Sequence, residues 1–229
     1  SDVYGDEFEK LYTKYENEMK HLEKIKARDL MSKIIEAQIE TGQPYMLYKD
    51  SINNKSNQKN IGVIKSSNLC AEIVEYSDKN ETSVCNLASI ALPKFVKKSD
   101  KKLIYDYDAL YETAKLATKN LDEVIDINFY PTDKTERSNN KHRPIGLGIQ
   151  GLADVYFKLG IAYESEEAKE INKLIFETIY FGALEASCEL AKEKGAYETF
   201  KSSPISEGKF QFDLWNVNPS SKWDWDSLR

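Results

Sequence analysis

The chain has 229 residues, of which 41% are hydrophobic and 31% are charged, and it carries a net charge of −6. This balance is typical of a globular protein in water. It lacks both the basic excess of a nucleic-acid-binding protein and an apolar run of about 18 residues that would cross a bilayer. The three cysteines lie far apart, which argues against the disulfide framework of a small secreted protein. We therefore expect a reducing, cytoplasmic location, with no membrane and no nucleic acid among the partners.

Both ends of the chain lack the usual signals of a terminus. The sequence begins at Ser1 rather than at a methionine, and it stops at Arg229 without a helix cap or a breaker. We therefore expect an internal piece of a longer protein. Its length allows one large domain or two small ones.

Two amphipathic helices are predicted to open the chain. Apolar residues at helical spacing predict the first over residues 6–24. Its histidine, His21, lies in the charged end, and we interpret it as a solvated surface residue. The second is predicted over residues 27–41, closed by Gly42 and Pro44.

The next segment should be extended and then irregular. Residues 44–48 are short and aromatic, which predicts a strand. Residues 49–60 are polar and rich in asparagine, which predicts a loop. Residues 61–65 alternate weakly and lead to a polar triplet.

That triplet is Asn68, Cys70 and Glu72, at alternate positions. On an extended backbone its three side chains leave from one face, whereas a helix would place Cys70 opposite the other two. An amide, a thiol and a carboxylate on one face would give a small polar substrate a hydrogen-bonding group, a reactive sulfur and a general base. The alternative is a strand edge with a buried cysteine between solvated neighbours. The intervening apolar side chains are Leu69, Ala71 and Ile73.

A turn and a long helix follow. Residues 77–82 are a strong turn signal, so we expect a hairpin-like excursion that returns through residues 83–92 and carries Cys85. After a lysine-rich connector, a helix is predicted over residues 106–127 with Asp106 as its N-cap. The residues expected to face inward are Leu110, Ala114, Ala117, Leu121, Val124 and Ile125.

Residues 129–143 are polar and predict a long loop. Its histidine, His142, is a candidate catalytic base, but its charged neighbours favour a role in positioning the loop. The glycines that follow have the spacing of a nucleotide-binding loop, but no strand is predicted before them. We interpret them as close packing of a helix that begins near Gln150 and ends at Gly160. These glycines are Gly146, Gly148 and Gly151.

The longest helix is predicted over residues 165–194, with Ser165 as its cap. Gly182 and Ala183 would let a neighbouring backbone approach it closely. Cys188 lies on this helix and is interpreted as structural. The aromatic tail, residues 197–225, suggests a docking surface or exposed core.

Four segments together resemble the large catalytic subunit of class I ribonucleotide reductase. They are SNLCAEIVEY around Cys70, SVCNLASIALP around Cys85, RPIGLGIQGLAD, and IFETIYFGALEASCELAKEKGAYETF. The resemblance continues through YGDEFEKLY near the start and through DLWNV and WDW near the end. It implies an α/β fold, a ten-stranded barrel with the radical cysteine on a finger loop inside it. Residues 1–229 would be one helix-rich piece of that barrel domain with too few strands to close it, comprising a finger-loop region at about 61–93 and a helical remainder at 100–229.

The resemblance also implies a mechanism for reducing ribonucleoside diphosphates to 2′-deoxyribonucleotides. The cysteine at the position of Cys70 becomes a thiyl radical that takes the 3′ hydrogen, and the carboxylate of Glu72 takes the proton of the 3′-hydroxyl. The amide of Asn68 binds the substrate, and Leu69 and Ala71 complete the substrate-binding stretch. Cys85 matches one member of the redox-active dithiol, whose partner lies outside this chain.

The partners that the resemblance implies are a small subunit carrying a diiron-tyrosyl radical, a second large subunit, and thioredoxin or glutaredoxin as reductant. ATP and deoxynucleotides would act as allosteric effectors in this pathway of deoxyribonucleotide biosynthesis for DNA replication. We expect no metal or cofactor bound by this piece, and no turnover by it alone.

Four alternatives stay open. A non-catalytic helical binding or scaffold module would make the triplet incidental. A zinc site on Cys70, Cys85 and His142 has poor ligand spacing. A cysteine hydrolase using Cys70 and His142 lacks an oxyanion-hole signature. Cys70 and Cys85 would pair with each other only if the radical cysteine were not kept reduced.

Overall fold

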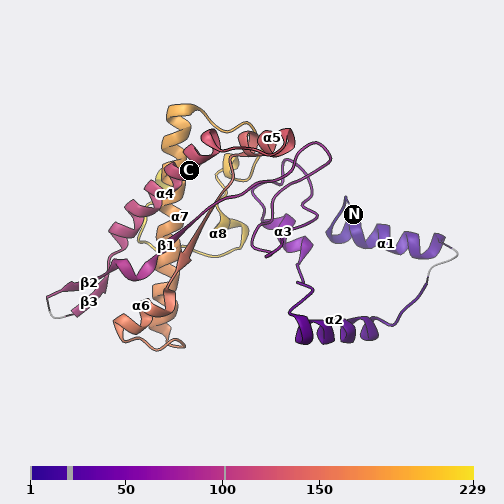
Figure 1. The fold of residues 1–229 in the computed structure, drawn as a ribbon, viewed down its shortest axis with the longest axis horizontal. Helices are drawn as coiled ribbons and strands as arrows, with labels where there is room; N and C mark the ends of the chain where they lie inside the picture. The colour runs from indigo at the N-terminus through magenta and orange to yellow at the C-terminus, as the bar shows by residue number, and fades with distance from the viewer. Residues whose placement is uncertain (1, 20–22, 101) are drawn as a thin grey trace. The chain divides into compact units, whose positions relative to one another are not determined.

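The computed structural model describes residues 2–19, 23–100 and 102–229. They belong to two compact units, residues 1–77 and residues 78–229, which we describe one at a time (Figure 1). Among the described residues, no helix combines the length and the apolar character that crossing a membrane requires.

The described residues of the N-terminal unit form the helices α1 (Gly5–Glu18), α2 (Ala27–Thr41) and α3 (Lys49–Lys55). The two predicted amphipathic helices are confirmed, although the first ends at Glu18; the interpretation of His21 lies outside the described residues. Gly42 ends α2 with a φ of 74°, a left-handed conformation that glycine adopts without a steric penalty.

Two expectations for residues 44–60 are wrong. Residues 44–48 form no strand, and α3 lies where a loop was predicted. Asn53 explains the helix: its buried side chain donates to the carbonyl of Ile64 at 3.0 Å and accepts from the Ile64 amide at 2.8 Å. An asparagine that suggests a turn in the sequence here ties a helix to a distant segment.

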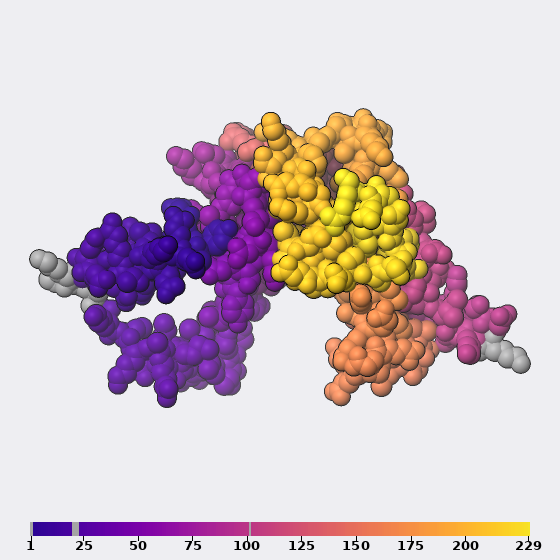
Figure 2. All heavy atoms as spheres, turned by 180° about the vertical axis from the view of Figure 1, so that it is seen from behind, coloured from indigo at the N-terminus to yellow at the C-terminus, as the bar shows by residue number. Residues whose placement is uncertain are grey.

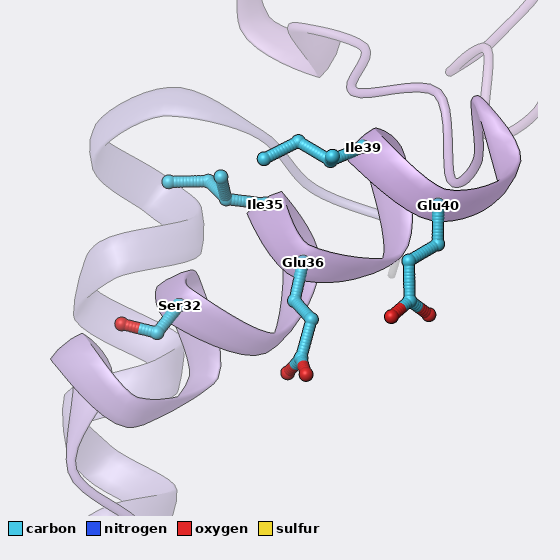
Figure 3. A pocket seen from close by; sticks show the side chains of 5 residues that line it. All are labelled: Ser32, Ile35, Glu36, Ile39 and Glu40. Atoms are coloured by element: carbon cyan, nitrogen blue, oxygen red, sulfur yellow. The ribbon is translucent and has the colours of Figure 1, made fainter.

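Helix α2 keeps an apolar stripe at its surface within this unit. Ile35 and Ile39 project side by side from the helix, with Glu36 and Glu40 on the adjacent side (Figure 3). Together with Ser32, these four residues line a shallow hollow, and all five lining residues belong to α2. Its carboxylates and isoleucines lie on an open surface and do not form an enclosed site.

The C-terminal unit is built around two parallel strands, β1 (Asn86–Ala91) and β4 (Ile145–Gln150), with Leu87 opposite Gly146. This pairing corrects two expectations. Within residues 83–92, Asn86–Ala91 pair with β4 in parallel instead of returning as one arm of a hairpin, and the glycine-rich segment is mainly a strand. The helix expected from Gln150 begins later, as α6 (Leu152–Leu159), which Gly160 ends as predicted.

The connection between β1 and β4 contains more structure than the sequence indicated. A 3-10 turn (Leu92–Phe95) leads into an antiparallel pair, β2 (Val96–Ser99) and β3 (Lys102–Tyr105), in the segment expected to be a connector. Helix α4 (Tyr107–Ile127) follows, capped by Asp106 as predicted. Val124 is exposed rather than inward, whereas Leu110, Ala114, Leu121 and Ile125 are buried.

Helix α5 (Asp133–His142) replaces the predicted long loop. Its start is fixed by a reciprocal cap in which the Thr132 hydroxyl accepts from the Thr135 amide, at 3.3 Å, and the Thr135 hydroxyl accepts from the Thr132 amide, also at 3.3 Å. Such a cap satisfies amides that the first turn of a helix leaves unpaired. The sequence did not predict this helix because its buried face is polar, so it has no apolar stripe at helical spacing.

Helix α7 (Glu166–Lys194) packs along α4, which in turn contacts both strands of the β1–β4 pair (Figure 1). Ser165 caps it, as predicted. A β-carbon on Gly182 would lie 2.9 Å from the carbonyl oxygen of Tyr111, so the predicted close approach is confirmed at this glycine. The buried cluster comprises Ile90, Leu92, Tyr105, Leu110, Ala114, Val155, Ile175 and Ile179.

The aromatic tail forms part of the core of this unit. Its short helices, Ile205–Glu207, α8 (Gln211–Leu214) and Trp225–Leu228, lie among the yellow residues in Figure 2. Trp223 stacks on Tyr111 and on Phe181, each with ring centroids 5.0 Å apart, and Trp225 is buried. The docking surface suggested for the tryptophans is therefore wrong for Trp225.

Candidate active site

The polar triplet lies on a tight turn. The amide of Ala71 donates to the carbonyl of Asn68 at 3.2 Å, and Ala71 has a φ of 66°. The Ser67 hydroxyl donates to the carbonyl of Ile73 at 2.6 Å, which closes the base of the turn. Cys70 is exposed at its tip.

The side chain of Asn68 organises this turn. Its Oδ1 accepts from the Ile73 amide at 3.1 Å, and its Nδ2 donates to Glu72 Oε1 at 2.7 Å. The amide is thereby held with its nitrogen on the carboxylate, which leaves Glu72 as an acceptor beside the thiol-bearing turn.

The extended backbone expected for residues 68–72 is wrong. Alternation along a strand does not bring these groups together; a reversal of the chain does, with Ala71 in the left-handed region. On an extended backbone the Ala71 side chain would face away from the triplet. In the structure its contribution is the left-handed backbone conformation, which costs about 1 kcal/mol or more for a residue with a β-carbon.

Cys85 immediately precedes β1, and it is half-buried and forms no disulfide within the described residues. The next residue, Asn86, is buried and bonded to two distant groups. Its Nδ2 donates to Asn139 Oδ1 at 3.0 Å and to the carbonyl of Pro144 at 2.9 Å. Buried amides are stable when paired in this way, so these bonds fix the chain beside the thiol.

Asn139 connects this contact to the rest of the unit. It is fully buried on α5, and its Nδ2 donates to Tyr130 Oη at 2.5 Å. Tyr130 donates in turn to the carbonyl of Ile125, at the end of α4, at 2.7 Å. A hydrogen-bonded chain therefore joins the start of β1 to two helices.

His142 ends α5 with both ring nitrogens close to oxygen atoms. Nδ1 lies 2.9 Å from Thr199 Oγ1, and Nε2 lies 3.3 Å from Oε2 of the buried Glu81. Burial lowers the pKa of His142, and the Glu81 carboxylate opposes that change. This geometry agrees with a positioning role, and it gives no support to His142 as a zinc ligand or a hydrolase base.

A cluster of carboxylates on α4 is held in ion pairs. Asp122, Glu123 and Asp126 on α4 come within ligand spacing of one another, but cations already neutralise them. Arg143 Nε lies 2.7 Å from Asp122, and Lys194 Nζ lies 2.6 Å from Glu123. Cys188 is half-buried on α7, where burial raises its thiol pKa.

Comparison with known proteins identifies the family to which the chain belongs. The family model described as the ribonucleotide reductase barrel domain matches residues 1–229. The chain belongs to the ribonucleotide reductase family. The two-stranded sheets of its structure close no barrel within the described residues.

Named relatives of this ribonucleotide reductase chain agree. It is 58% identical, over 230 residues and its full length, to ribonucleoside-diphosphate reductase large chain 2 of Saccharomyces cerevisiae. Over its full length it is also 53% identical to the large chain of Schizosaccharomyces pombe and 51% identical to the large subunit of Arabidopsis thaliana. It covers 26%, 28% and 30% of these three proteins, so it spans little more than a quarter of their length.

Sequence reasoning missed the residues that support Cys85. Asn86 adjoins a quoted motif, and a polar residue after a candidate catalytic cysteine was a usable signal. No sequence signal pointed to Asn139, because it lay in a segment predicted to be a loop. Gly146 was noticed, but only as one member of a glycine pattern.

Proposed function

We propose that this chain is the part of a ribonucleoside-diphosphate reductase large subunit that carries the radical cysteine, and that Asn68, Cys70 and Glu72 perform the chemistry on the ribose. The match of the family barrel-domain model to all 229 residues carries this proposal. The hydrogen bond of Asn68 to Glu72 supports the assignment of roles, since it joins the substrate-binding amide to the base.

In the proposed reaction, the Cys70 sulfur takes a hydrogen atom from C3′ of a ribonucleoside diphosphate, forming an S–H bond and a carbon radical. Glu72 accepts the proton of the 3′-hydroxyl, and the 2′-hydroxyl takes a proton from a dithiol that includes Cys85 and leaves as water. The dithiol then supplies two electrons and its second hydrogen to the substrate at C2′ and becomes a disulfide, Glu72 returns its proton to the 3′-oxygen, and Cys70 returns the hydrogen atom to C3′. One ribonucleotide and one dithiol give one deoxyribonucleotide, one disulfide and one water.

The same proposal extends to partners and location. A small subunit would generate the radical, a second large subunit would complete the dimer, and thioredoxin or glutaredoxin would reduce the disulfide. ATP and deoxynucleotides would regulate the parent protein in the cytoplasm. The isolated chain, incubated with small subunit and dithiothreitol, should form no deoxynucleotide.

The deciding experiment replaces Cys70 in the complete subunit. Cys70→Ser, assayed with small subunit and thioredoxin, should abolish deoxynucleotide formation while substrate still binds. The O–H bond of serine is stronger than the S–H bond of cysteine, so the radical that takes the C3′ hydrogen does not form on serine. Cys188→Ser, the same change on α7, should retain activity. Normal turnover by Cys70→Ser would exclude the proposed role, and normal turnover after joint replacement of Asn68, Cys70 and Glu72 would favour a scaffold.

A further inference from the structure

Gly146 faces the thiol of Cys85 across the β1–β4 pair. It lies opposite Leu87, and the side chains of residues 85 and 87 leave the chain on the same side. A β-carbon placed on Gly146 would be 3.0 Å from Cys85 Sγ and 2.5 Å from Leu87 Cδ2. The sulfur therefore occupies space that the missing side chain leaves open.

The backbone does not require glycine at this position. Gly146 lies within β4 and is absent from the residues with positive φ, unlike Gly151, whose φ is 78°. Any residue adopts the conformation of Gly146, so space rather than flexibility accounts for the glycine.

Nearby contacts hold Cys85 against this space. Asn86 is anchored by its two buried hydrogen bonds, to Asn139 and Pro144. The preceding segment is tied to α5, because the Thr82 amide donates to the carbonyl of Lys134 at 3.2 Å. With the main chain held on both sides, a methyl group at residue 146 would displace the Cys85 sulfur and the Leu87 side chain rather than the strand.

We propose that Gly146 is a positioning residue for Cys85: by lacking a side chain, it lets the sulfur lie against β4 in the orientation from which its disulfide forms and is reduced. This inference rests on the proposed redox role of Cys85. Disulfides require a narrow range of distances and dihedral angles, and displaced ones are reduced more easily.

The test uses the full-length subunit carrying Gly146→Ala. Dithiothreitol redox buffers set the potential, and alkylation followed by mass spectrometry measures the oxidised fraction of Cys85. We expect the disulfide to become about tenfold easier to reduce, a shift of about 30 mV. The reduced Cys85 thiol should also react with iodoacetamide roughly threefold faster, because the methyl group turns the sulfur outward.

Two variants isolate the cause. Gly148→Ala lies on the same strand, and its β-carbon would meet only Ala88 O and Ser89 Oγ, both at 3.7 Å, so neither readout should change. The double variant Gly146→Ala/Leu87→Ala removes the leucine contact and leaves the sulfur contact, so both shifts should persist. An unchanged iodoacetamide rate in Gly146→Ala, or shifts that disappear in the double variant, overturn the inference.

A separate variant distinguishes this inference from the function on which it rests. Cys85→Ser should lose turnover with thioredoxin if the redox role is correct. Full turnover by Cys85→Ser refutes that role. The iodoacetamide rates of Gly146→Ala and Gly148→Ala need no disulfide, so they decide whether Gly146 positions the thiol in either case.

Discussion

The turn around Cys70 and the strand start at Cys85 place a cysteine in opposite ways. At the turn, Ser67, Asn68 and Ile73 supply the contacts, all within a few residues of the thiol, and Cys70 is exposed. At the strand, Asn86 reaches Asn139 at a separation of 53 residues, and the groups involved are buried. Groups on an exposed turn contribute little to stability, whereas buried hydrogen-bonded groups contribute much.

The largest expected effect is the loss of turnover when Glu72 is replaced. If the replacement lowered stability instead, the contrast between the exposed turn and the buried strand start would fail. Glu72→Gln in the full-length subunit removes the proposed base, so kcat should fall by about 10²–10⁴-fold. Because Glu72 is exposed, the free energy of unfolding should change by less than about 0.5 kcal/mol. Steady-state turnover and urea denaturation measure the two quantities, with Glu40→Gln on α2 as control. A large loss of stability with normal kcat would contradict the assignment.

Asn139 tests the buried side of the comparison. Asn139→Ala leaves the Asn86 amide and the Tyr130 hydroxyl without their shared partner, which should cost about 2–4 kcal/mol of stability. Urea denaturation of the chain measures this loss. The exposed neighbour Asn140→Ala should change stability by less than about 0.5 kcal/mol. Equal effects of the two substitutions would show that the buried network is not stabilising.

Gly182 extends the comparison to the helix pair. Gly182→Ala forces a methyl group to within 2.9 Å of the Tyr111 carbonyl, so α4 and α7 must separate. The resulting loss should exceed the helix-propensity gain of about 1 kcal/mol and leave a net destabilisation of about 1–2 kcal/mol. Thermal unfolding measures it, with the exposed Ser187→Ala as control. An increase in stability would mean that the helices adjust without cost.

The smallest effect concerns a partly exposed ion pair. Hydrogen bonds from Lys115 and Lys119 hold the pKa of Glu189 at about 2, below its ordinary 4.5. Because the pKa of Glu189 is lower in the folded state, its carboxylate stabilises the folded chain above pH 4.5, and this stabilisation is lost as the pH falls toward 2. Glu189→Gln should therefore cost less than about 1 kcal/mol at pH 7 and almost nothing near pH 2. Denaturation at both pH values tests this, and an equal cost at both would show that charge is not responsible.

The sequence predicted the elements whose signals are local. Helices α2, α4 and α7 were located because periodicity, the caps Asp106 and Ser165, and the terminating Gly42 lie within or beside them. The candidate turn residues were found for the same reason, since Asn68 and Glu72 are near neighbours and the surrounding segments resemble a known family.

The rest depended on distant partners. Helix α3 forms where Asn53 binds Ile64, and α5 presents polar residues to β1, so both looked like loops in a polar sequence. The partner of β1 is β4, which no pattern within either strand specifies. The left-handed backbone of Ala71 and the lack of space for a side chain at Gly146 likewise depend on the folded structure, so neither alternation nor composition could predict them.

The parallel pairing of β1 and β4 also sets an order of events when the protein folds. The turn needs contacts only 5 residues apart, between Asn68 and Ile73, and forms at little entropic cost. The surroundings of Cys85 need contacts 53 and 58 residues apart, so they form only after α4, α5 and β4 have been synthesised. A nascent chain therefore presents an unshielded Cys85 thiol until β4 docks, and premature oxidation during synthesis should strike this cysteine.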